Sequence, residues 1–380
     1  MDRSNYMLRE IYRPQILLTI ENLSLLNESG ALPHKAFIAK SLNRLQKLIP
    51  KDEYDFDFYV HRLIKICIDL EAYSLCNQLI YFASDHNFRL KISKEIFGLI
   101  KQLLRRTEFD LALELIELLD TNPEFQELII IAKSRSLIGL GKFNDAHELL
   151  WRSFGDRIRC FSNSATNFPT IIPKSIYQFW DSKEIPLVIS RRMDSWRVLN
   201  PGWSHHVFNS ESAKQIMSDV GGFQALRAFE SLQVPAAQAD LFRYAVLIKF
   251  GGVYVDADDK PSLPLDISLG NIKGIVFIEK RLWHIQNSFI VSPPSSLLLQ
   301  NIFDKAIWNV NQRLNKSISA ITGPALVSRI LRSKLENEFK SDTVYLIPKE
   351  LGMGFRYLSG WGDRELNRHW STISRSDYYH

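Results

Sequence analysis

The chain has few cysteines, no long hydrophobic run and no dense block of basic residues. Its 380 residues include three cysteines, Cys67, Cys76 and Cys160, whose number and spacing fit neither a disulfide framework nor a metal motif. No stretch approaches the roughly 18 apolar residues of a membrane-spanning helix, and the first residues lack the apolar core of a signal peptide. We therefore expect a cytoplasmic protein without a transmembrane segment, either free or peripheral at the inner face of the membrane.

The charge is nearly balanced. Lysine and arginine number 47 against 42 acidic residues, which gives a net charge of +5. No run of four or more Lys or Arg occurs, so nucleic-acid binding is not expected. Hydrophobic residues make up 46% and charged residues 23% of the chain, an ordinary globular composition. The length favours two domains.

Residues 1–158 are predicted to be helical, because apolar residues recur there at steps of three and four while Pro and Gly are scarce. A pattern of an aromatic residue, a small residue and Leu, three positions apart, recurs in this region. Its copies are Tyr73/Cys76/Leu79, Phe109/Ala112/Leu115 and Phe143/Ala146/Leu149. The intervals are close to the period of about 34 residues in tetratricopeptide repeats. We interpret 1–158 as a tetratricopeptide-like domain that binds a partner protein; an irregular helical bundle is the alternative.

The composition changes near residue 160. Residues 159–170 are rich in Ser, Asn and Thr, contain Pro and show no helical periodicity, so they are predicted to form a linker. From 171 to 380, short apolar runs alternate with helical patterns, which predicts an α/β domain. The expected strands lie near residues 175–180, 204–209, 251–258, 274–280, 287–292 and 344–348.

The most informative stretch is 235–261. Its first part, 236–250, has a helical pattern in which Asp240 and Arg243 share one face. The pair Gly251-Gly252 is typical of a helix end. Taken alone, Asp240 and Arg243 also fit an ion pair on a helix surface.

A short strand, Val253–Val255, follows these glycines and delivers Asp256, Asp258 and Asp259 at its carboxyl end, where ligand sites of open α/β sheets collect. Paired carboxylates suit a hard divalent ion that neutralises a diphosphate. A solvated turn is the alternative. For Asp259 we favour an exposed turn position over a role behind the metal ligands.

The string ADLFRYAVLIKFGGVYVDAD, residues 239–258, resembles the signature of glycosyltransferase family 32, the enzymes with a DXD sugar-binding region. This family includes yeast-type alpha-mannosyltransferases and bacterial capsule and lipopolysaccharide enzymes. The similarity extends from Ile171 to Trp370. It includes further segments in the family's order: Ile172–Trp180, Leu199–Glu211, Asn287 with the residues after it, Thr322–Pro324 and, loosely, Arg368–Ser374.

The resemblance implies a GT-A fold, a Rossmann-like domain with a mostly parallel sheet, and a UDP- or GDP-sugar as donor. Trp180 would lie near the nucleotide base, and Tyr254 would flank the diphosphate. Asp240 and Arg243 would contact the sugar hydroxyls and a phosphate, while Asn287 would face the sugar. The implied donor-binding residues are Trp180, Asp240, Arg243, Tyr254, Asp256 and Asn287.

The resemblance also implies a divalent metal ion, Mn²⁺ or Mg²⁺. Asp258 would coordinate it, with Asp256 nearby and Ser371 completing the contacts. Catalysis is expected from Asp240, Arg243, Asp256 and Asp258, with retention of anomeric configuration.

The sequence therefore predicts a metal-dependent glycosyltransferase with a saccharide or lipid-linked acceptor, acting in capsule or lipopolysaccharide biosynthesis. A protein-directed effector or toxin, or a helical-repeat scaffold without activity, remain alternatives.

Overall fold

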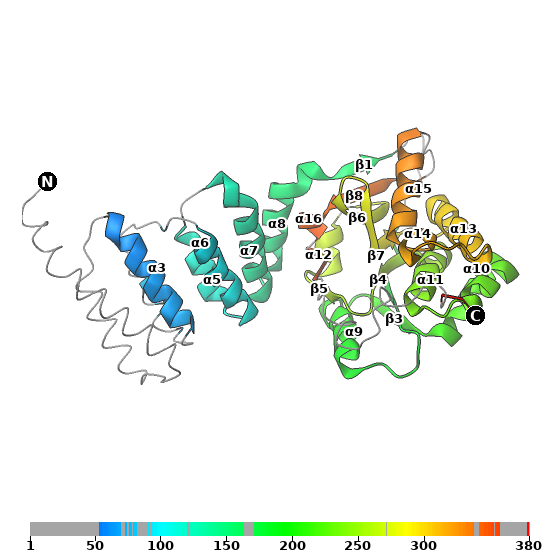
Figure 1. Ribbon diagram of the computed structural model, residues 1–380, viewed down its shortest axis with the longest axis horizontal. Coiled ribbons are helices and arrows are strands. Elements are labelled where there is room, and N and C mark those ends of the chain that lie inside the picture. The colour runs from blue at the N-terminus through cyan, green and yellow to red at the C-terminus, as the bar shows by residue number, and fades with distance from the viewer. Residues whose placement is uncertain are drawn as a thin grey trace, which may run out of the picture. The chain divides into compact units, whose positions relative to one another are not determined.

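The computed structural model divides into two compact units, Met1–Leu149 and Leu150–His380 (Figure 1). It describes residues 53–69, 73, 76–77, 79–81, 90, 93–119, 122–162, 171–270, 272–337, 342–352, 354–357 and 378–379. The division comes earlier than the boundary that the sequence predicts at residue 158. The predicted linker is also wrong in part, because Arg159–Phe161 forms a strand of the sheet.

The first unit consists of helices in its described residues. A buried apolar cluster made chiefly by α3, α5 and α6 forms its core. The helix α7 packs closely against α6 at Gly139. A Cβ atom there would lie 2.3 Å from the ring of Phe109, so the missing side chain makes this approach possible. The helices are α3 (Glu53–Asp69), α5 (Lys94–Arg105), α6 (Phe109–Glu117), α7 (Gln126–Gly139) and α8 (Phe143–Phe154), with a short 3₁₀ turn at Pro123–Phe125.

The α5–α6 and α7–α8 turns are built alike. Thr107 and Gly141, which occupy equivalent positions, both have positive φ angles, 63° and 73°. Each turn is closed by a backbone hydrogen bond of the same type, Glu108 N–H to Leu103 O at 3.0 Å and Lys142 N–H to Leu137 O at 2.9 Å. This likeness agrees with the interval in the sequence pattern. A tetratricopeptide-like domain stays a prediction, since the region around Tyr73 is described only in part.

The second unit contains a seven-stranded sheet with the order β1-β8-β6-β7-β4-β2-β3. Five strands run in one direction, while β1 and β7 run antiparallel to their neighbours. The sheet is therefore mixed but mostly parallel, as the sequence predicts. Its strands are β1 (Arg159–Phe161), β2 (Ser175–Phe179), β3 (Ser204–Phe208), β4 (Gly252–Val255), β6 (Ile275–Arg281), β7 (His284–Ser292) and β8 (Val344–Pro348).

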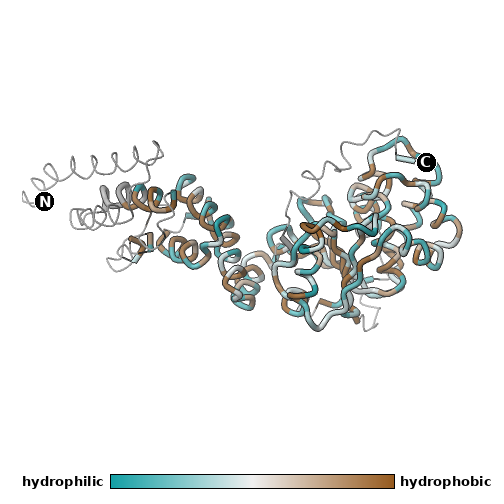
Figure 2. The backbone as a smooth tube through the Cα atoms, turned by 90° about the horizontal axis from the view of Figure 1, so that it is seen from below, coloured by the Kyte–Doolittle hydropathy of each residue, from teal (hydrophilic) through white to brown (hydrophobic). Residues whose placement is uncertain are grey.

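Helices cover the sheet on both sides. Figure 1 shows α10, α11, α13, α14 and α15 grouped on one side and α9 and α12 on the other. In Figure 2 the brown, hydrophobic stretches of this unit gather toward its middle. The central strands β4 and β7 are largely buried, as expected for a sheet covered on both faces. The bounds are α9 (Leu187–Leu199), α10 (Ser210–Ser231), α11 (Pro235–Phe250), α12 (Leu265–Leu269), α13 (Leu297–Asn311), α14 (Ile318–Ile321), α15 (Pro324–Asn337) and α16 (Lys349–Gly352).

Three small elements complete the unit. A 3₁₀ turn, Gly155–Arg157, follows α8, and the short strands β5 (Lys260–Pro261) and β9 (Arg356–Tyr357) pair outside the main sheet. Among the helices that the structure describes, none combines the length and apolar content that a bilayer crossing requires. A mostly parallel sheet between two helical layers fits the GT-A-like fold expected for this unit.

Candidate active site

Two glycines turn the chain from α11 into the central strand β4. Gly251 and Gly252 have φ angles of 66° and 106°, which non-glycine residues rarely adopt. A Cβ atom at Gly251 would lie 2.6 Å from the backbone nitrogen of Pro294, and one at Gly252 would lie 2.5 Å from the carbonyl oxygen of Ser175. The close turn lets β4 insert between β2 and β7, so that Asp256 follows at the carboxyl end of a central strand.

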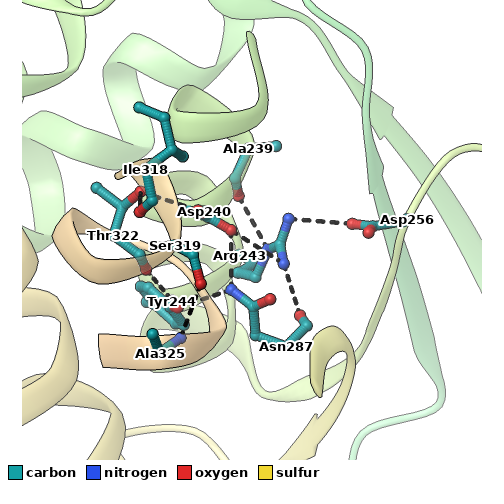
Figure 3. A network of polar contacts seen from close by, with 10 residues as sticks. All are labelled: Ala239, Asp240, Arg243, Tyr244, Asp256, Asn287, Ile318, Ser319, Thr322 and Ala325. Carbon is teal, nitrogen blue, oxygen red and sulfur yellow. Dashed lines mark hydrogen bonds and ion pairs between the residues drawn. The ribbon is translucent and has the colours of Figure 1, made fainter. Parts of the chain in front are cut away.

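Asp240 on α11 is the centre of a buried polar network (Figure 3). Its side chain is almost fully buried, with 5% of the residue exposed. Oδ1 accepts a hydrogen bond from Nδ2 of Asn287 at 2.8 Å, and Oδ2 accepts one from Oγ1 of Thr322 at 2.8 Å. Burial raises the pKa of this carboxyl group, while the positive charge of Arg243 and the two hydrogen bonds act in the opposite direction.

Arg243 links this network to the end of β4. Its Nη1 lies 3.1 Å from Oδ1 of Asp240 and donates to the backbone carbonyl of Asn287 at 2.7 Å. Its Nη2 donates to Oδ1 of Asp256 at 3.0 Å, and Nε donates to the carbonyl of Ala239 at 3.2 Å. Burial acts to lower the pKa of the guanidinium, but the surrounding negative charges, Asp256 foremost, raise it. Arg243 thus remains a cation that orients two carboxylates.

The tyrosines of the site are interior residues. Tyr254 is 1% exposed, and the guanidinium carbon of Arg243 lies 4.7 Å from the centre of its ring. This burial corrects the expectation that Tyr254 flanks the diphosphate, because a direct contact needs exposed ring atoms. Tyr244 donates its hydroxyl to the carbonyl of Thr322 at 2.8 Å and accepts from Nδ2 of Asn287 at 3.0 Å. Burial raises the pKa of both phenols, so they stay neutral.

Asn287 is also an interior residue. It lies on β7, and only 5% of it is exposed. Its side-chain nitrogen Nδ2 donates hydrogen bonds to Asp240 and Tyr244, and its backbone carbonyl accepts one from Arg243. Asn287 thus holds Asp240 in place, and its own contact with the sugar stays a prediction.

The aspartates after β4 differ in exposure. The side chain of Asp256 is 30% exposed, and its backbone N–H bonds to the carbonyl of Ser288 at 2.9 Å. Asp258 is half-buried. Asp259 is 2% exposed, so the preferred expectation of an exposed turn residue is wrong. The carbonyl of Asp259 accepts a hydrogen bond from Nε1 of Trp196 on α9 at 3.0 Å, which holds the turn against that helix.

Trp180 lies beside the same turn. It is half-buried and packs in a small apolar cluster with Ala257, the residue between the two motif aspartates. Ile189 and Met193 of α9 belong to this cluster too. The ring nitrogen of Trp180 donates to the carbonyl of Glu184 at 3.2 Å. The structure therefore brings Trp180 to the DXD segment, as a nucleotide-binding role requires.

A metal ion of the implied kind fits Asp256 and Asp258. Within the described ranges, no group of three or more His, Cys, Asp or Glu side chains is arranged to hold a metal ion. Magnesium, however, is usually bound by one or two carboxylates together with substrate phosphates and water. The two partly exposed carboxylates at the end of β4 would supply the protein's share of these ligands. Ser371, the third predicted ligand, lies outside the described residues.

Sequence reasoning missed three members of the site. Thr322 and Tyr244 both take part in the network around Asp240. Gln178 on β2 donates to the carbonyl of Asp256 at 3.2 Å and is contacted by His205 at 2.7 Å. Thr322 was visible only as part of a turn before a helix, and that turn is confirmed, since α15 begins at Pro324.

Residues 187–273 match the family described as "Glycosyltransferase sugar-binding region containing DXD motif". This part of the chain belongs to that family. The matched region contains Asp240, Arg243, Asp256 and Asp258, the residues expected to act in catalysis. Trp180, Asn287 and Thr322 lie outside it.

Curated relatives in yeasts are similar over part of the chain. An initiation-specific alpha-1,6-mannosyltransferase of Schizosaccharomyces pombe is 29% identical over 133 residues, 29% of this chain and 34% of that protein. The putative glycosyltransferase HOC1 of Saccharomyces cerevisiae is 28% identical over 185 residues, 40% of this chain and 47% of its own length. Inositol phosphoceramide mannosyltransferase 3 of S. pombe is 33% identical over 94 residues, 24% and 26% of the two chains. The similarity thus spans a quarter to a half of these relatives' lengths.

Among solved structures, the PaToxG glycosyltransferase covers 56% of this chain and 81% of its own, with 17% identity and a TM-score of 0.34. At this score the likeness carries no argument about fold or activity.

Proposed function

We propose that this chain is a glycosyltransferase that moves a sugar from a UDP- or GDP-sugar to a saccharide or lipid-linked saccharide acceptor. The observation that carries the proposal is the buried network from Asp240 through Arg243 to Asp256, which ends at the DXD segment of the family region. Keeping charge buried in this way is costly unless it is paired. Strongly perturbed ionisable groups of this kind gather at functional sites.

Mannose is the sugar we propose for the donor. Two of the relatives described above are named as mannosyltransferases, one initiation-specific and one acting on inositol phosphoceramide. None of the three is named for capsule or lipopolysaccharide assembly, so the proposal replaces that expected pathway with mannosyl transfer. The named acceptor of the third relative is a lipid, which supports a lipid-linked acceptor as one of the two classes tested.

The chemistry follows from the positions of the aspartates. A divalent ion held by Asp256 and Asp258 would neutralise the charge that develops on the leaving diphosphate. Arg243 fixes the carboxylate of Asp256 in one orientation, and Trp180 offers an aromatic face for the base. Asp240 would accept hydrogen bonds from sugar hydroxyls. These residues act by positioning and charge stabilisation, which suits retention by displacement on the same face of the sugar.

The remaining parts of the proposal concern the helical unit and the location of the protein. The paired helices α5–α6 and α7–α8 offer a surface for a partner protein or the acceptor. We propose a cytoplasmic location, free or at the inner face of the membrane.

The proposal is tested by incubating the protein with UDP- and GDP-sugars, with and without Mn²⁺, and measuring the released nucleotide diphosphate. We expect release from a mannosyl donor that requires the ion. Labelled sugar should then enter a lipid or oligosaccharide fraction when acceptor is supplied. Label in a protein band would instead show a protein-directed transferase. Neither release nor binding of any donor would contradict the proposal and favour an inactive scaffold.

A further inference from the structure

The orientation of Asp240 is set by a residue far away in the sequence. Thr322 lies 82 positions along the chain, yet its hydroxyl donates to Oδ2 of Asp240 at 2.8 Å. The carbonyl of Ile318 is the other acceptor near this hydroxyl, at 3.4 Å. Because the contact with the carboxylate is shorter and involves a charged acceptor, it is the stronger of the two.

Thr322 is itself held firmly. It is fully buried, its backbone N–H donates to the carbonyl of Ile318 at 2.9 Å, and its carbonyl accepts the hydroxyl of Tyr244 at 2.8 Å. Both its backbone groups are therefore fixed, one by α14 and one by α11. A hydroxyl on such a backbone has few alternative positions and can impose a direction on the carboxylate it contacts.

The next residue leaves room for this contact. A Cβ atom at Gly323 would lie 3.0 Å from Oδ2 of Asp240 and 3.0 Å from the Cα atom of Ser319. Such contacts are tighter than side chains normally make, so a methyl group at position 323 would push Asp240 away from the turn by a few tenths of an ångström. Thr322 and Gly323 therefore contact Oδ2 of Asp240. Its other oxygen, Oδ1, is bound by Asn287 and Arg243.

We propose that Thr322 is a positioning residue for recognition of the donor's sugar. Its hydroxyl holds Asp240 in the one orientation in which this carboxylate meets the sugar hydroxyls. The inference rests on the proposed function, because it assigns the sugar to Asp240 and the diphosphate to the metal ion at Asp256 and Asp258.

With these roles, a change at Thr322 should affect the affinity for the nucleotide-sugar and not the affinity for the free nucleoside diphosphate. Removing the hydroxyl of Thr322 should weaken binding of the intact nucleotide-sugar, which Asp240 contacts. The same change should leave binding of the free nucleoside diphosphate unaltered, since that ligand lacks the sugar that is transferred. A merely structural role in the turn would weaken both ligands together or neither.

The experiment compares three variants with the wild-type protein by calorimetry, using GDP-mannose and GDP in the presence of Mn²⁺. Thr322→Val keeps the shape and removes the hydroxyl; Thr322→Ser keeps the hydroxyl. Ser292→Ala is the matched control, because it deletes a fully buried hydroxyl on β7 that donates to the adjacent carbonyl of Pro293. Thermal unfolding of each variant accompanies the titrations.

For Thr322→Val we expect about tenfold weaker binding of GDP-mannose, the usual effect of an unpaired buried polar group, with unchanged binding of GDP. Thr322→Ser and Ser292→Ala should bind both ligands like the wild type. If Thr322→Val does not fold, Gly323→Ala carries the same expectation, because its methyl group displaces Asp240.

Equal losses for both ligands, or no loss for either, would overturn the positioning role while leaving the proposed function intact. The wild-type protein failing to bind either ligand, with UDP and UDP-sugars failing too, would instead overturn the proposed function and this inference with it.

Discussion

The two units of the chain bury polar side chains in different ways. In the helical unit, the buried polar residues among those described are Ser134 and Ser136, whose hydroxyls donate to carbonyls four residues earlier in the same helix. In the sheet unit, Asp240 bonds to partners 47 and 82 positions away. Local bonds within one helix satisfy the hydroxyl of the side chain but do not join distant segments of the chain. The distant bonds of Asp240 hold a buried carboxylate, which is costly to remove from water, so their presence points to chemistry.

The largest effect is expected at the DXD segment of the sheet unit. Asp258→Asn keeps the shape of the side chain but removes the charge that would hold the metal ion, so donor turnover should fall at least about a thousandfold. Asp304→Asn is the control, since Asp304 is exposed on α13 and accepts a hydrogen bond from Gln300 of the same helix. Turnover is measured as released nucleotide diphosphate. Similar rates for the two variants would remove the metal role of Asp258.

A large loss of stability is expected when the buried charges are broken. Arg243→Met leaves Asp240 without its cation, and such a change costs about 3–5 kcal/mol. Arg197→Met removes an exposed ion pair with Asp194 on α9 and should cost less than about 1 kcal/mol. Urea unfolding gives both values. Comparable losses would mean that the network contributes no more than a surface pair.

The helical unit should lose stability without losing chemistry. A methyl group at Gly139 would collide with the ring of Phe109, so Gly139→Ala is expected to cost about 1–3 kcal/mol. Gly98 is helical too, but nothing lies within 4 Å of a Cβ atom there, and Gly98→Ala should stabilise by roughly 0.5–1 kcal/mol. Unfolding curves test the pair. Weaker donor binding in Gly139→Ala would contradict the assignment of donor binding to the sheet unit.

The smallest effect concerns pH. Burial lowers the pKa of His205 below its ordinary value of 6.5, so the unfolded chain binds a proton at a pH where the folded protein does not. Stability should therefore decline as the pH falls from about 6.5 toward the lowered pKa. His205→Gln should show a shallower decline over this range in urea unfolding at several pH values. Parallel curves would show that His205 contributes nothing to the pH dependence.

Local features of the sheet unit were predictable from the sequence. The strands β2 (Ser175–Phe179) and β8 (Val344–Pro348) lie where the apolar runs near 175–180 and 344–348 predict them. The turn from α11 into β4 follows from two adjacent glycines, and the position of Asp256 and Asp258 follows from that turn.

Features that depend on distant contacts were not predictable. Thr322 carries no signal of its contact with Asp240, because the pairing depends on where α14 ends against α11. In the sequence Asp259 has the features of an ordinary turn residue. Its burial depends on the contact with Trp196 of α9. The strand Arg159–Phe161 falls within the predicted linker because its neighbours in sequence are polar, whereas pairing with β8 decides its structure.

The most direct test of the metal-dependent donor site is a titration of Mn²⁺ followed by electron paramagnetic resonance, with GDP present. We expect the wild-type protein to remove the signal of free Mn²⁺ beyond what GDP alone removes, and Asp258→Asn not to do so. An equal loss of signal with both proteins would contradict a metal site at the end of β4.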